Sequence, residues 1–212
     1  MSSCSRLCAA STDIAPWLIP AKPALDLIGG RESIPRICPR PWPMKYLQGY
    51  PDALREQVQQ LIADGQLGTV LLKKYPEVHG VRTDKALYDY VMELKNRFLR
   101  NSEPLSRVLF DNKLQVIAHA LGTHTTISRV QGSKLKSKRE IRVASLFKEG
   151  PAEFLKMIAV HELAHIKERE HDKAFYKLCT YMEPQYHQYE FDLRVYLTHL
   201  DTVGKLEWSA NP

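Results

Sequence analysis

The chain has 212 residues and a net charge of +6; 44% of its residues are hydrophobic and 25% are charged. This composition is ordinary for a globular domain and excludes a fibrous protein. No apolar run reaches the roughly 20 residues that cross a bilayer, and the four cysteines do not form a disulfide framework. We therefore expect a cytoplasmic protein without membrane contact.

Residues 1–43 differ in composition from the rest of the chain. They contain seven of the thirteen prolines and show no sustained period of 2 or 3.6 residues. A segment without periodic apolar residues cannot easily form a packed element. We predict a disordered leader over 1–43, an N-terminal helical region over 44–105 and a core region over 106–212.

The region 44–105 is predicted to contain two helices. Apolar residues recur at helical spacing over 51–63 and again over 83–99. Pro51 suits a first turn and Gly65 follows the end of the first helix. Thr83 or Asp84 can cap the second helix.

The core region begins with short β-like segments and continues with helices. The segments RVLFD, LQVIAHAL, HTTISRV and EIRVASLF are rich in β-branched and aromatic residues, which predicts three or four antiparallel strands. Helical periodicity runs from Pro151 to about residue 167, Asp172 can cap a helix to residue 182, and Pro184 can open one to about residue 200. Helices, a small sheet and further helices indicate an α+β fold.

Most of the net positive charge lies in one short stretch, residues 132–142. This stretch has five basic side chains against one glutamate, which accounts for four of the six net charges. Such a run is more often a solvated loop between strands than a binding surface. We expect at most weak, salt-sensitive nucleic-acid contact, through Lys134, Lys136, Lys138 and Arg139.

The helix predicted from Pro151 carries polar residues that need partners. Its first three turns are apolar on nearly every side, which is typical of a buried helix. His161 and His165 are four residues apart, so both imidazoles leave one face and can bind the same zinc ion. Glu162 points about 100° away, where its carboxylate can accept a proton from a zinc-bound water. This pattern predicts a catalytic zinc site.

A catalytic zinc usually has three protein ligands and one open position. His171 is the first candidate for the third ligand, provided that the chain turns back between His165 and the next helix. Glu183 and Glu190 are the alternatives. The spacing of the three histidines equals that of the metzincins, but Glu168 stands where those proteins have a glycine, which argues against a metzincin.

The sequence around these histidines resembles the YgjP-like metallopeptidase domain, which is related to the SprT-like and WLM zinc proteases. The resemblance rests on VHELAHIKEREHDKAFYKL, preceded by EIRVASLFKEGPAEFLKMIAV and followed by MEPQY, and it covers about residues 80–200. It implies a minimal zincin, in which a small antiparallel sheet packs on the active-site helix. The leader and the helix over 51–63 lie outside the resemblance, so we expect extra N-terminal helices beside this fold. It also implies His161, His165 and His171 as zinc ligands and Glu162 as general base, in a zincin-like core over 106–212.

The expected function is that of a zinc metalloendopeptidase, with a protein or peptide as substrate and a water activated by Glu162 as nucleophile. One alternative is a metal-dependent endoribonuclease with a three-histidine site, but such enzymes lack the glutamate after the first histidine. Another is a non-catalytic zinc module that binds proteins, although a structural zinc normally has a fourth ligand.

Two sets of residues have no decided role in the sequence. Four side chains could stabilise an oxyanion, and the sequence does not choose among them: Tyr176, Tyr186, His187 and Arg194. Five histidines lack ligand spacing and are expected to be ordinary strand, loop or surface residues: His79, His119, His124, His187 and His199.

Overall fold

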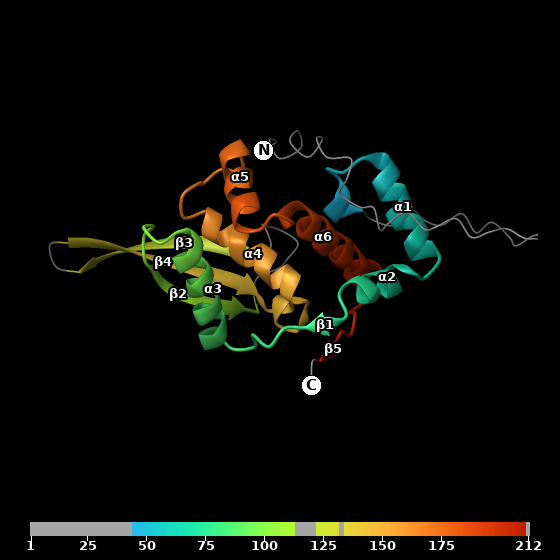
Figure 1. Ribbon diagram of the computed structural model, residues 1–212, viewed down its shortest axis with the longest axis horizontal. Coiled ribbons are helices and arrows are strands. Elements are labelled where there is room, and N and C mark those ends of the chain that lie inside the picture. The colour runs from blue at the N-terminus through green and yellow to red at the C-terminus, as the bar shows by residue number, and fades with distance from the viewer. Residues whose placement is uncertain (1–43, 113–121, 132–133, 211–212) are drawn as a thin grey trace, which may run out of the picture. The chain divides into compact units, whose positions relative to one another are not determined.

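The computed structural model describes residues 44–112, 122–131 and 134–210 (Figure 1). The predicted leader over 1–43 and the predicted strand LQVIAHAL lie outside these residues. The described chain combines helices and strands, which confirms the α+β class. Within the described part, no helix is both long and apolar enough to cross a membrane.

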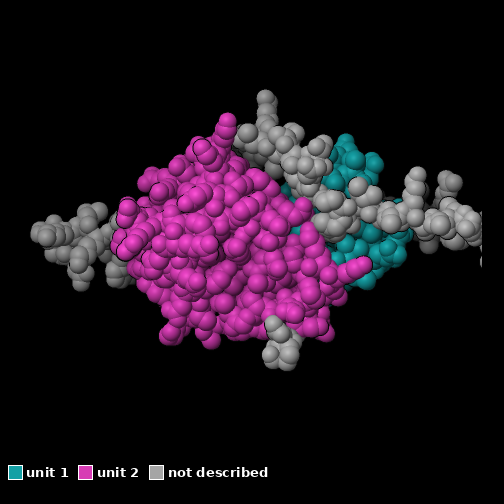
Figure 2. Space-filling model, viewed as in Figure 1, with its two compact units in different colours: residues 1–71, 191–206 teal, residues 72–190, 207–212 magenta. Residues whose placement is uncertain are grey.

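The chain divides into two compact units (Figure 2). One comprises residues 1–71 and 191–206, and the other comprises residues 72–190 and 207–212. The domain boundaries expected from the sequence, after residues 43 and 105, stay a prediction.

The described part of the first unit is helical. It contains a 3-10 turn, η3 (Lys45–Leu47), α1 (Asp52–Ala63) and the start of α2 (Leu67–Lys74). Gly65 follows α1 with φ +66°, a conformation that glycine adopts without strain. The rings of Tyr50 and Phe191 pack with centroids 5.0 Å apart. A Cβ on Gly68 would lie 2.9 Å from the His199 side chain, so α2 can approach this closely only with glycine.

In its described residues, the second unit is built on a three-stranded sheet. Its strands are β2 (Leu105–Asp111), β3 (Gly122–Gln131) and β4 (Lys134–Ala144), in the order β2-β4-β3. β3 and β4 pair antiparallel, but β2 and β4 pair parallel. The prediction of an antiparallel sheet is therefore wrong for β2, because β2 pairs with β4 and not with β3, the strand that follows it. The expectation of a loop over 132–142 is also wrong, because residues 134–142 belong to β4.

One face of the sheet is apolar and the other is charged. Val108 of β2 and both Ile141 and Val143 of β4 are buried, on the face against which α3 (Asp84–Phe98) and α4 (Ala152–Ala164) pack. On the opposite face, Arg142 donates to Glu140 at 2.8 Å and to Asp111 at 3.0 Å. Strand alternation explains the separation, since successive side chains point to opposite faces.

The helices of the second unit begin where the sequence predicts. The Thr83 side chain caps α3 by accepting from the Ala86 amide at 3.2 Å. Asp172 caps α5 (Lys173–Met182) by accepting from the Phe175 amide at 3.0 Å. α6 (Tyr186–Thr202) begins shortly after Pro184. α4 is buried on nearly every side, as its apolar sequence predicts.

A second, two-stranded sheet lies beside the start of α4. β1 (Glu77–Val78) pairs in parallel with β5 (Ser209–Ala210). Tyr75 and Trp208, next to these strands, both pack on Phe154 in the first turn of α4, with ring centroids 5.1 and 6.3 Å away. A 3-10 turn, η4 (Ser145–Glu149), connects β4 to α4.

Candidate metal centre

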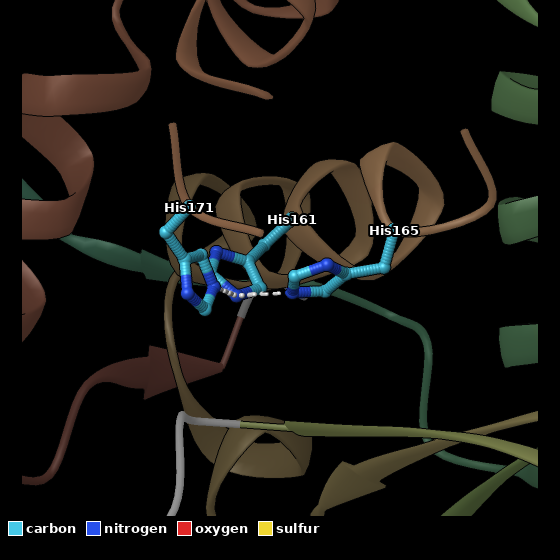
Figure 3. A group of neighbouring side chains, drawn as sticks. All are labelled: His161, His165 and His171. Carbon is cyan, nitrogen blue, oxygen red and sulfur yellow. Dashed lines mark hydrogen bonds between the residues drawn. The ribbon is translucent and has the colours of Figure 1, made fainter. Parts of the chain in front are cut away.

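The C-terminal end of α4 and the segment before α5 bring three imidazoles together. Figure 3 shows the imidazole of His161, which lies on α4, between those of His171 and of His165, the residue directly after α4. His161 and His171 have their Nε2 atoms 3.1 Å apart, and those of His161 and His165 are 3.3 Å apart. One nitrogen from each of the three rings lies within 4.8 Å of the others.

These distances fit a small cation. A tetrahedral ion with nitrogen ligands at 2.0–2.1 Å holds those nitrogens about 3.3 Å from one another. The type of ligand also fits, because imidazole nitrogens bind zinc and other late transition metals better than magnesium or calcium. The cluster is therefore a candidate site for a metal ion.

Hydrogen bonds at the far side of two rings fix which nitrogen faces the cluster. His165 Nδ1 lies 3.0 Å from the Glu168 carbonyl oxygen. A carbonyl can only accept, so Nδ1 carries the proton and Nε2 keeps its lone pair. His161 Nδ1 lies 2.7 Å from the Tyr186 hydroxyl, which can accept in the same way. Burial lowers the pKa of His165, which also favours the neutral ring that binds metals.

Glu162 lies beside the cluster and not within it. The residue is 1% exposed, and its Oε2 is the carboxylate oxygen that lacks a hydrogen-bond partner among the described residues. Burial raises its pKa to about 8. A buried carboxylate without a partner is costly, and a nearby cation would offset that cost.

The segment that carries His171 turns back sharply from α4. The Ile166 amide donates to the Leu163 carbonyl at 3.1 Å, so the last turn tightens after His165. His171 itself is exposed. Phe175 of α5 is fully buried and lies under the three imidazoles, with ring centroids 4.6–5.0 Å from theirs.

The alternative third ligands lie elsewhere. Glu183 forms an ion pair with Lys156 and accepts from the Gln185 amide at 3.0 Å. Neither Glu183 nor Glu190 belongs to the histidine cluster. The structure thus brings together the first candidate, His171, and leaves out both glutamates.

The candidate oxyanion donors separate into two groups. Tyr176, Tyr186 and His187 form an aromatic cluster beside the imidazoles, in which the rings of Tyr176 and His187 are 5.4 Å apart. Arg194 instead donates to the Tyr46 carbonyl at 3.4 Å. Sequence reasoning missed that Tyr186 supports His161, because no spacing rule connects residues 25 positions apart on different helices.

His79 and His199 form hydrogen bonds with backbone groups. His79 accepts from the Val81 amide at 3.1 Å through Nδ1, and its Nε2 lies 2.7 Å from the Phe147 carbonyl. His199 Nδ1 lies 2.9 Å from the Gly204 carbonyl. Burial lowers the pKa of both rings. His119 lies outside the described residues, as does the side chain of His124.

Comparison with known proteins gives two matches and one absence. Residues 103–196 match the family described as YgjP-like, metallopeptidase domain. The chain is 59% identical over 157 residues to a protein of Escherichia coli (strain K12) named UTP pyrophosphatase, an alignment that covers 74% of this chain and 94% of that protein. No solved structure matches the chain.

Proposed function

Because the chain belongs to the YgjP-like family of metallopeptidase domains, we propose that it is a zinc-dependent hydrolase whose substrate is a nucleoside triphosphate, with UTP as the first compound to test. The convergence of three histidine Nε2 atoms beside a buried carboxylate carries the hydrolase part of this proposal. The name of the 59% identical relative supports the choice of substrate.

The three histidines would bind the metal, and Glu162 would act as the base. His161, His165 and His171 would hold the ion, and zinc suits three imidazoles at these distances. A bound zinc supplies positive charge that polarises the substrate and makes water more acidic. Tyr186 and the Glu168 carbonyl would orient two of the ligands, as outer partners of metal-bound histidines do.

Glu162 is the proposed general base. Its unpartnered Oε2 would take a proton from the attacking water. The water oxygen then bonds to the α-phosphorus, and the bond from that phosphorus to the bridging oxygen breaks. Pyrophosphate leaves with the electron pair of that bond, and Glu162 gives the proton to it. The products are the nucleoside monophosphate and pyrophosphate.

Peptide hydrolysis is the second candidate, and one specific observation favours it. Glu162 follows the first histidine ligand directly, as in zinc peptidases with the HExxH pattern. The same base would then activate water for attack on a carbonyl carbon.

Contact of Lys134, Lys136, Lys138 and Arg139 with nucleic acid stays a prediction, and so does the function of a three-histidine ribonuclease.

One set of assays separates these functions. The zinc-loaded protein is incubated with UTP, with a peptide library and with single-stranded RNA, and pyrophosphate, peptide fragments and RNA fragments are measured. The same assays are run on Glu162→Gln, which keeps the size and polarity of the side chain. Glu153→Gln is the matched control, because Glu153 lies in the first turn of the same helix.

We expect pyrophosphate release from UTP that falls by a factor of about 10²–10⁴ in Glu162→Gln and is unchanged in Glu153→Gln. Peptide cleavage without pyrophosphate release would overturn the proposed substrate and favour the peptidase. RNA cleavage that survives Glu162→Gln would favour the ribonuclease. A protein that binds zinc and hydrolyses none of the three would favour the binding module.

A further inference from the structure

We propose that Arg139 is a positioning residue for the metal centre, because it holds the turn through which the chain passes from His165 to His171. This inference rests on the proposed binding of a metal by the three histidines. Sequence reasoning grouped Arg139 with three lysines as a candidate nucleic-acid contact, whereas the structure engages its side chain inside the molecule.

The Arg139 side chain makes one hydrogen bond and one ion pair. Its Nη1 donates to the Ile166 carbonyl at 2.9 Å, and its Nε lies 2.6 Å from the Glu103 carboxylate. The side chain is only 13% exposed, so solvent screens these contacts less than it screens a surface ion pair. Arg139 therefore links β4, the residues before β2 and the end of α4.

The position of Ile166 gives the contact its importance. The last carbonyls of a helix lack partners within the helix, and a cation near them is stabilised by the helix dipole. Ile166 comes directly after His165, and the carbonyl of Glu168 fixes the ring of His165. Five residues, 166–170, separate His165 from His171, so a shift of the turn moves the start of the segment that carries the third histidine.

Arg139 is itself held firmly. Its backbone lies at the middle of the sheet, where β4 pairs with both neighbours: Arg139 pairs with Leu105 of β2 and with Thr126 of β3. Pairing on both sides therefore anchors the backbone of Arg139, and its guanidinium holds the Ile166 carbonyl in the turn after α4. In the structure, Nε2 of His171 lies 3.1 Å from Nε2 of His161. Loss of the Arg139 anchor should widen the distribution of His171 positions and so reduce the fraction in which the two nitrogens are this close.

Arg142 provides a matched control. It lies three residues further along the same strand, on the opposite face, and it also makes two charged contacts, with Glu140 and Asp111. A substitution there removes two ion pairs from β4, where Arg139→Gln removes one ion pair and one hydrogen bond, and it does so without touching the turn after α4. An effect through general sheet stability would appear in both arginine variants.

The experiment measures zinc affinity by competition with a chromophoric chelator. The proteins compared are the wild type, Arg139→Gln, Arg142→Gln, His171→Ala and the double variant of Arg139→Gln with His171→Ala. We expect Arg139→Gln to weaken zinc binding about 10–100-fold, the range found for partners that orient metal ligands. Arg142→Gln should bind as the wild type does, and Arg139→Lys should recover part of the loss.

The double variant identifies the route. If Arg139 acts by placing His171, Arg139→Gln has no further effect once His171 is alanine, because the two substitutions remove the same contribution. Additive losses, or wild-type affinity in Arg139→Gln, would overturn the inference. Wild-type protein that binds no zinc would instead overturn the proposed function. If Arg139→Gln does not fold, Glu103→Gln replaces it, since it removes the anion that holds the guanidinium, and the same loss and the same non-additivity are expected.

Discussion

Replacing Tyr186 by phenylalanine tests whether the metal centre depends on its outer hydrogen bonds. The Tyr186 hydroxyl lies 2.7 Å from Nδ1 of His161, and the residue is fully buried. Phenylalanine keeps the ring, which lies nearly parallel to that of His161 at 16°. The substitution therefore removes the hydroxyl, which also forms a side-chain hydrogen bond with Cys179, and leaves the packing largely intact.

The magnitude follows from the burial of this contact. A buried polar group that loses its partner costs about 1–3 kcal/mol. Nδ1 of a metal-bound His161 must carry a proton, and in Tyr186→Phe that proton has no acceptor at this position. At 1.4 kcal/mol for each factor of ten, the expected loss of zinc affinity is roughly 10–100-fold, as for other outer partners of metal ligands.

The assay is zinc competition at constant pH, with urea unfolding of the metal-free protein as a measure of the fold. Tyr196→Phe is the control, because Tyr196 is a second buried tyrosine of α6 and no member of the histidine cluster. Wild-type zinc affinity in Tyr186→Phe would refute the role of the hydroxyl. An equal loss in Tyr196→Phe would show that the effect comes from the helix as a whole.

Three further predictions address other parts of the chain. Gly68→Ala should destabilise the fold by about 1–3 kcal/mol, since its Cβ would lie 2.9 Å from two side-chain atoms, and a urea midpoint equal to that of the wild type would contradict this. Burial lowers the pKa of His79 below its ordinary value of 6.5. As the pH drops below 6.5 the unfolded chain therefore takes up a proton before the folded chain does, and the free energy of unfolding should fall. An equally steep fall in His79→Gln would show that other groups cause the pH dependence. Changing Lys134, Lys136 and Lys138 to alanine should lower the salt slope of any nucleic-acid binding by about one unit per lysine, and an unchanged slope would place the contact elsewhere.

The histidine cluster and the helices other than α2, which the sequence analysis did not predict, could be predicted because their signals are local. A cap such as Thr83 or Asp172 and its amide partner are three residues apart, and both form the predicted bond. His161 and His165 share a helix face by spacing alone. The buried character of α4 follows from its composition, which leaves no polar face for solvent.

The strand order and the supports of the metal centre could not be predicted, because they depend on contacts between distant residues. A high content of β-branched and aromatic residues identifies β2 and the second part of β4 as strands, but it does not say that β2 pairs with β4 in parallel. Arg139 reads as one more basic residue in a charged stretch. Only the fold places it beside Ile166, 27 positions later.

The parallel pairing of β1 with β5 has a consequence for synthesis of the chain. Residues 77–78 find their partners only at residues 209–210, so a ribosome adding 5–20 residues per second leaves β1 without that strand for roughly 7–26 s. Trp208, which packs on the first turn of α4, arrives equally late. During this interval the open edge of β1 and the exposed ring of Phe154 offer a surface to chaperones or to other nascent chains.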